Sequence, residues 1–182
     1  MGKGYVLVEV HGELKAADNL ISRLSADLGI PRAWSPAIRW PNLHQKNGLQ
    51  KGANFMRTKQ DVDALLIFRD EDDACPKHRG PSLAAWLREL CLPFPSAIVL
   101  LHPEYEVLLR RGIKEWLTSH FPPNRSYKPT LDQLPLTRLI DFSVLRQSNL
   151  PCFGTLERAL QFLAKGEAGS VYPSLEGSAT RR

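Results

Sequence analysis

The segment 64-ALLIFRDEDDACPKH-78 joins a continuous apolar run to four consecutive acidic residues, Asp70 to Asp73. An apolar run of this length is typical of a strand that is buried on both faces of a parallel sheet. Sites in open parallel sheets form beyond the carboxyl ends of the strands. The acidic residues therefore predict a functional site directly after a central strand.

The rest of the chain alternates between strand-like and helix-like patterns. Apolar or β-branched runs at 5–10, 63–68 and 96–101 predict strands. Helices are predicted from apolar spacing and terminal residues at 14–28, at 82–90 with Ser82 as the N-cap, from just after Pro103, and at 150–166 with an end near Gly166. This alternation predicts an α/β fold with a mostly parallel central sheet flanked by helices.

Length and composition predict one domain. The chain has 182 residues, of which 43% are hydrophobic, enough for one core. We expect the domain to span residues 1–166, and the Gly/Ser-rich segment 167–182 to be a flexible tail that is loose or folds on a partner. Without a signal peptide or an apolar run of about 18 residues, a soluble cytoplasmic protein with no membrane partner is expected. Three cysteines without a C-x-x-C pair favour neither a disulfide framework nor a thiolate zinc site.

A basic stretch between residues 39 and 59 makes nucleic acid, DNA or RNA, a plausible partner. The formal net charge is +5, and this stretch contains no acidic residue. Aromatic side chains at Trp40, His44 and Phe55 are interleaved with the cations and could stack on bases. The candidate nucleic-acid-binding residues are Arg39, Lys46, Lys51, Arg57 and Lys59. The alternative is an ordinary solvated loop followed by a helix start.

Carboxylates from two strand ends are expected to converge. Asp70 and Asp72 alternate after the second predicted strand, Glu9 closes the first, and Glu13 follows shortly after. Such a cluster is commonly stabilised by a divalent cation, and oxygen ligands favour Mg²⁺ or Mn²⁺. The alternative is a solvated turn whose carboxylates cap the next helix or pair with the cations at 77–79.

The same residues resemble the TOPRIM (topoisomerase-primase) pattern, in which a Glu closes the first strand and Asp-x-Asp closes a later one. More narrowly, the chain resembles small bacterial TOPRIM-like proteins encoded beside AAA-type or ABC-type ATPases and related to overcoming-lysogenization-defect nucleases. The matching residues are Val8, Glu9 and Glu13; Arg69, Asp70, Asp72, Cys75 and Pro76; and Glu104, Tyr105 and Glu106. The resemblance extends through "YKPTLDQ", "LIDF" and "LPCFGTLERAL". One departure is Val10, which stands where the family usually has Gly.

This resemblance implies a single TOPRIM-like, Rossmann-like domain with a carboxylate metal site. Asp70 and Asp72 would hold Mg²⁺ or Mn²⁺, Glu9 would ligate the metal or act as general acid/base, and Glu13 would be a further ligand. Secondary candidates near the site are His102, Glu104, Glu106 and Lys128. Structural roles are open for His102, as a hydrogen-bonding residue, and for the two glutamates, as charges in a first helical turn.

Three function classes follow. The first is a metal-dependent phosphodiesterase or nuclease subunit that acts on DNA or RNA, together with an ATPase partner in a defence-type system against phage. The second is a catalytically silent TOPRIM-like subunit that binds nucleic acid or regulates a partner, for which Val10 is one argument. In the third, the acidic cluster is structural and the protein serves to contact an ATPase.

Overall fold

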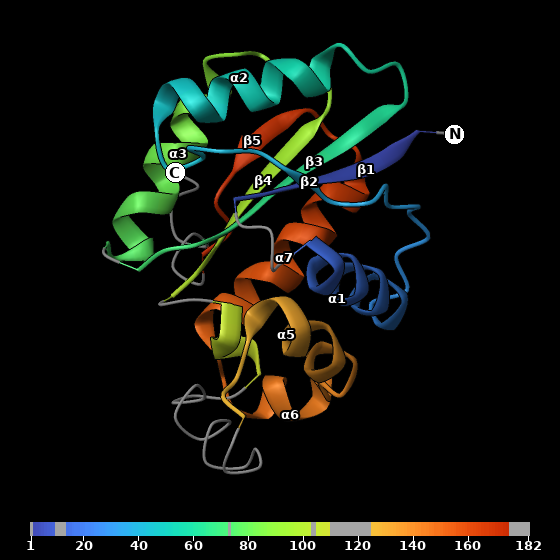
Figure 1. Ribbon diagram of the computed structural model, residues 1–182. Coiled ribbons are helices and arrows are strands. Elements are labelled where there is room, and N and C mark those ends of the chain that lie inside the picture. Colours follow the sequence, from blue (N-terminus) through green and yellow to red (C-terminus); the bar gives the residue numbers. More distant parts are fainter. Residues whose placement is uncertain (1, 10–13, 73, 103–104, 110–124, 175–182) are drawn as a thin grey trace.

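The computed structural model describes residues 2–9, 14–72, 74–102, 105–109 and 125–174 and contains a five-stranded sheet in the order β2-β1-β3-β4-β5 (Figure 1). Every adjacent pair of strands is parallel, so the predicted α/β fold with a parallel sheet is confirmed. The strands are β1 (Lys3–Val8), β2 (Ile38–Arg39), β3 (Val62–Asp70), β4 (Pro95–Leu101) and β5 (Gly169–Val171).

The central strands form because their side chains are apolar on both faces. All seven residues of β4 are buried. In β3, Leu66 and Phe68 belong to one hydrophobic core, whereas Leu65 and Ile67 belong to a second core on the opposite face. The alternation follows from the two-residue period of a strand.

Helices cover the two faces of the sheet (Figure 1). One core is covered by α1 (Leu14–Asp27) and α7 (Pro151–Lys165), and the other by α2 (Lys46–Arg57) and α3 (Pro76–Arg88). The short helices η1 (Tyr105–Leu108), α5 (Pro129–Arg138) and α6 (Phe142–Gln147) extend the α1–α7 side, where Tyr105 and Phe142 join its core. Gly166 ends α7 with a left-handed φ of 74°, as its position in the sequence predicts.

The predicted helix starting at Ser82 is wrong at its beginning. The helix α3 begins six residues earlier, at Pro76, because a proline fits the first helical turn, where its missing N–H costs no hydrogen bond. Ser82 is therefore an interior residue, and its hydroxyl donates to the carbonyl of His78 at 3.1 Å. Most of the helix predicted after Pro103 falls outside the described residues.

Part of the segment 167–182, which was expected to be a flexible tail, is ordered in the structure. Residues Gly169–Val171 pair with β4 as the edge strand β5, and the Ser170 and Ser96 hydroxyls are 2.6 Å apart. Pairing with the backbone of β4 holds this segment in place. A strand of three residues is too short to show an apolar pattern in the sequence. Residues 175–182 lie outside the described residues.

The connections around β1 and β3 create a switch point in the topology. β1 and β3 are neighbours, yet the chain leaves β1 for α1 on one face and leaves β3 for α3 on the other. In open parallel sheets, ligands bind beyond the carboxyl ends of the strands at such a switch point. Within the part of the chain that the structure describes, no helix has the length and apolar composition that a membrane span needs.

Candidate functional site

Residues at the carboxyl end of β3 point alternately to the two faces of the sheet. Leu65 and Ile67 face α2 and α3, so the strand period places Arg69 on that same face. Leu66 and Phe68 face α1 and α7, so Asp70 is placed on the opposite face. Arg69 and Asp70 therefore extend from one edge in two directions.

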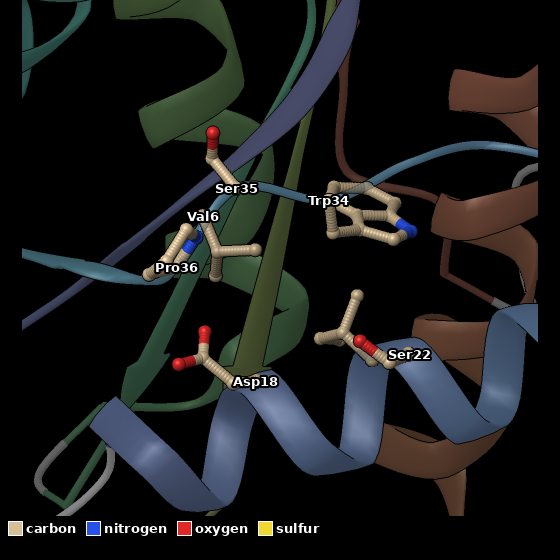
Figure 2. Close-up of a pocket in the computed structure, with 7 residues that line it drawn as sticks. Val6, Asp18, Ser22, Trp34, Ser35 and Pro36 are labelled. Carbon is tan, nitrogen blue, oxygen red and sulfur yellow. The ribbon is translucent and has the colours of Figure 1, made fainter.

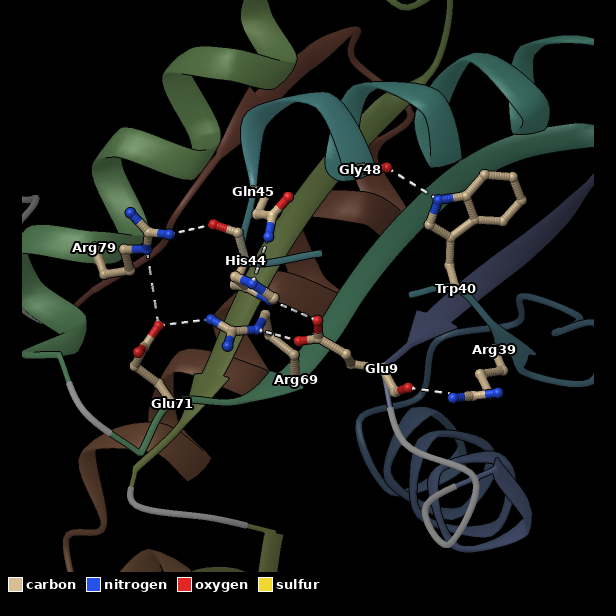
Figure 3. Close-up of polar contacts among 9 residues, drawn as sticks. All are labelled: Glu9, Arg39, Trp40, His44, Gln45, Gly48, Arg69, Glu71 and Arg79. Carbon is tan, nitrogen blue, oxygen red and sulfur yellow. Dashed lines mark hydrogen bonds and ion pairs between the residues drawn. The ribbon is translucent and has the colours of Figure 1, made fainter. Parts of the chain in front are cut away.

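Arg69 joins the ends of β1 and β3 (Figure 3). Its Nε donates to Oε2 of Glu9 at 2.9 Å, and its terminal nitrogen donates to Oε2 of Glu71 at 2.6 Å. Arg69 is only 8% exposed and Glu71 only 6%. A buried guanidinium needs such partners, because an uncompensated buried charge is strongly destabilising.

His44 and Arg79 complete this group, which we call the edge network: Glu9, His44, Arg69, Glu71 and Arg79. Nδ1 of His44 lies 2.8 Å from Oε1 of Glu9. Arg79 donates to the backbone carbonyl of His44, and its Nε lies 4.0 Å from Oε2 of Glu71. Residues from four parts of the chain, namely the end of β1, the turn before α2, the end of β3 and α3, thus meet on the α2–α3 side of the switch point.

The charges of the edge network keep Glu9 ionised. Partial burial alone would raise the pKa of the Glu9 carboxyl, but hydrogen bonds from His44 and Arg69 and their charges outweigh burial and hold this pKa below its ordinary value. Both carboxylate oxygens of Glu9 already have a partner. In this arrangement Glu9 anchors Arg69.

The expected convergence of Glu9, Glu13, Asp70 and Asp72 on one metal ion stays a prediction, and the faces of the sheet on which the described members lie bear on it. Glu9 lies on the α2–α3 face, whereas Asp70 is on the α1–α7 face, because neighbouring residues in a strand alternate. Asp72 is exposed just beyond β3. Among the described residues no group of three His, Cys, Asp or Glu side chains could hold a metal ion, and Glu13 and Asp73 lie outside those residues.

Sequence reasoning missed Glu71 and His44 as members of this site. Glu71 lies among acidic neighbours in the sequence, although its two-residue separation from Arg69 indicates a shared face and opposite charges. The pairing of Glu71 with Arg79 agrees with part of the alternative in which the acidic turn pairs with nearby cations. The sequence predicts His44 only as an aromatic group of the basic stretch, because its partner Glu9 is 35 residues away.

The basic stretch is distributed over β2, α2 and the turn after α2. Arg39 in β2 is exposed and its Nε donates to the backbone carbonyl of Glu9 at 3.3 Å. Lys46, at the start of α2, forms an ion pair with Glu89 at 2.7 Å. Lys51 and Arg57 are exposed on α2, and Lys59 lies over the rings of Tyr5 and Phe55.

The secondary candidates have structural contacts. Nδ1–H of His102 donates to the carbonyl of Glu71 at 2.6 Å, which ties the end of β4 to the acidic turn. Glu106 is buried and accepts a hydrogen bond from the Tyr127 hydroxyl at 2.7 Å. Burial and then Glu106 raise the pKa of Tyr127, so the phenol remains a donor. Lys128 is exposed at the N-cap position of α5, and Glu104 lies outside the described residues.

A separate hollow of about 170 Å³ lies between α1 and residues 34–36 (Figure 2). Asp18 lines it and accepts a hydrogen bond from the Ala37 backbone N–H at 2.5 Å. Burial raises the pKa of the Asp18 carboxyl, and this hydrogen bond offsets part of the effect. The hollow is on the α1 side of the sheet, so it does not belong to the edge network.

The fold and the edge network define an α/β protein whose all-parallel sheet is compatible with a Rossmann-like domain. No model of a known protein family matches the sequence, and a search of curated proteins found no match.

Proposed function

We propose that this protein is a metal-dependent phosphodiesterase or nuclease subunit of TOPRIM type that acts on DNA or RNA. The observation that carries the proposal is the placement of opposite charges around one sheet edge. Cations at Arg69 and Arg79 occupy the α2–α3 side of the switch point, and Asp70 belongs to the other side. A phosphate bound at the edge would meet the guanidinium groups of Arg69 and Arg79 on the side where Glu9 and Glu71 are already paired, and Asp70 on the other side.

Phosphate binding in this proposal falls to the cations with accessible side chains. Arg79 has a side chain that is 30% exposed, and Arg39 is exposed beside the backbone of Glu9. Arginine is suited to this task because its planar fork of N–H donors matches phosphate oxygens. Arg69 would contribute its charge from beneath while Glu9 and Glu71 hold its orientation.

Asp70 and Asp72 are the residues that would hold Mg²⁺ or Mn²⁺. Magnesium sites commonly use one or two carboxylates together with water and substrate phosphate, so this pair suits the ion without Glu9. A bound ion would polarise the phosphate and activate water. Asp72 is exposed directly after β3, where solvent and substrate reach it.

An ATPase partner of AAA or ABC type in an antiphage defence system, acting in the cytoplasm, completes the proposal. Its support is the resemblance described above together with exposed apolar side chains on the α5–α6 region. Leu131, Leu139 and Val144 are 62%, 79% and 55% exposed, respectively. Large apolar side chains exposed close together in sequence are a feature of protein contact surfaces.

Metal-dependent thermal stability tests the metal site. An ion that binds only the native state at about 100 times its Kd adds about 2.7 kcal/mol of stability. For a chain of this size that shift raises Tm by about 5–10 °C. We expect Mg²⁺ or Mn²⁺ to raise the Tm of the wild type and not of Asp70→Asn, while Asp27→Asn, a change distant from β3 in sequence, retains the shift. An unchanged wild-type Tm at saturating metal would contradict the site.

A second candidate is a catalytically silent subunit that binds nucleic acid. The observation that favours it is that both oxygens of Glu9, the expected ligand or general base, are engaged by Arg69 and His44. Salt-sensitive binding of DNA or RNA without a metal-dependent Tm shift would favour this candidate over the nuclease.

A further inference from the structure

Phe55 is a large aromatic side chain left exposed on the outer surface of α2. It is 41% exposed, and Trp40 stacks on it with ring centroids 5.3 Å apart and an interplanar angle of 24°. The Trp40 indole N–H donates to the carbonyl of Gly48 at 2.9 Å, which fixes the indole against α2 (Figure 3). The two rings therefore form a firmly held aromatic surface.

Gly52 makes this close packing of Trp40 on α2 possible. A Cβ atom at Gly52 would lie 3.0 Å from Cδ1 of Trp40 and 3.1 Å from the Leu7 side chain. Because those distances are tighter than ordinary contacts, a larger residue would push the indole away. Gly52 thus permits the stacking of Trp40 and Phe55, although a glycine inside a helix lowers the stability of that helix.

Lysines flank the exposed ring at helical spacing. Lys51, Phe55 and Lys59 are separated by four residues, so they follow one stripe along α2 and its end. The Lys59 Nζ lies over the Phe55 ring at 5.2 Å from its centre, and Lys51 is exposed. Two carboxylates near the ends of α2, Glu89 and Asp61, are paired with Lys46 and Lys3.

We propose that the α2 platform, formed by Trp40, Lys51, Phe55 and Lys59, binds single-stranded nucleic acid. One base stacks on Phe55 in place of the Lys59 ammonium, and Lys51 and Lys59 contact the adjacent phosphates. Single strands are the class that fits because their bases have accessible faces, whereas a duplex keeps its bases stacked inside. The proposal rests on the proposed function, since it specifies the kind of nucleic acid that reaches the edge network.

The direction of α2 connects the platform to that site. The helix begins directly after His44 of the edge network and Gln45, which contacts His44, and Phe55 lies nine residues beyond Lys46. At about 1.5 Å per residue the separation along the helix is about 14 Å. A short single strand that lies along α2 therefore reaches the edge network from the platform.

Fluorescence anisotropy of the full chain without metal tests the platform. The probes are a labelled oligothymidine of about 10 nucleotides and the same strand in a duplex. We expect the single strand to bind more tightly than the duplex. Phe55→Ala and Phe55→Leu should weaken binding of the single strand about 5- to 150-fold, the value of one base stacked on an aromatic ring, and Phe55→Trp should retain it.

Two controls separate stacking from unfolding. Gln161→Ala truncates an exposed side chain on α7, which covers the other face of the sheet, and should leave binding unchanged. Quenching of tryptophan emission by the oligonucleotide should largely disappear in Trp40→Phe, which keeps an aromatic ring at this position. Each variant is compared at a temperature below its measured Tm.

The outcomes are distinct. Single-strand affinity unchanged in both Phe55→Ala and Phe55→Leu, or equal affinity of the wild type for duplex and single strand, overturns the platform and leaves the proposed function standing. No binding of any nucleic acid by the wild type overturns both. Selective loss of single-strand binding, rescued by Phe55→Trp, supports the platform.

Discussion

Arg69 is the residue on which the geometry of the sheet edge depends. Its guanidinium lies between the carboxylates of Glu9 and Glu71, which come from the ends of two neighbouring strands. Because Arg69 is 8% exposed, water cannot replace a lost partner. The loss of either carboxylate is expected to affect the stability of the whole edge.

Glu9→Gln should lower the free energy of unfolding by about 1–3 kcal/mol, since it removes a charged partner from a buried group that retains Glu71. Urea denaturation at neutral pH measures the change. Glu89→Gln is the matched control, because it breaks an exposed pair with Lys46 and should have little effect. Equal effects of the two substitutions would contradict a structural role for Glu9.

The stability difference between wild type and Glu9→Gln is expected to depend on pH. The pKa of Glu9 is lowered in the folded state, so its contribution is fully present above the unfolded-state pKa and is lost as pH falls through the folded-state value. The stability difference between wild type and Glu9→Gln should therefore shrink across the acid range below the ordinary glutamate pKa. Urea denaturation at a series of pH values tests this, and a constant difference would contradict the ionised pair.

At the scale of elements, substitution of two helical glycines by alanine is expected to change the stability of the protein in opposite directions. In α3, a Cβ at Gly80 would lie 2.3 Å from the Tyr172 ring, whereas in α7 a Cβ at Gly154 would meet the mobile end of Arg158 at 3.2 Å. Gly154→Ala should stabilise by about 0.5–1 kcal/mol through helix propensity. Gly80→Ala should destabilise by about 1–3 kcal/mol through overpacking.

Thermal or urea denaturation of both alanine variants measures that difference. The result also tests whether the segment after β5 is packed, because Tyr172 contacts the α2–α3 core from there. If Gly80→Ala is as stabilising as Gly154→Ala, Tyr172 does not pack against α3.

The elements that could be predicted from sequence are those with long patterns. β3 and β4 are continuous apolar runs, and α1 and α7 have apolar residues at helical spacing. By contrast, β2 and β5 have two and three residues, too few to show a period. The beginning of α3 is hard to predict because a proline suits both a loop and the first turn of a helix, where Pro76 lies.

At the scale of the whole molecule, the sequence could locate the site but could not arrange its side chains. Parallel strands place Glu9 and Asp70 at one edge, which the pattern predicts. The face on which each of them lies depends on the register of the two strands. In that register Val8 pairs with Phe68, and both belong to the core on the α1–α7 side. The contacts of Arg69 with Glu9 and of His44 with Glu9 join residues 60 and 35 positions apart, a separation that no local pattern encodes.

Metal-dependent cleavage of single-stranded DNA and RNA tests the central claim most directly. The wild type, Asp70→Asn and Asp72→Asn are assayed with Mg²⁺ and Mn²⁺, alone and with a candidate ATPase of the proposed AAA or ABC type. The proposal predicts cleavage by the wild type that requires the metal, increases with the ATPase and falls by at least about 100-fold in either variant, as when a catalytic group is lost. No cleavage by the wild type under any of these conditions, or equal cleavage by wild type and both variants, would contradict it.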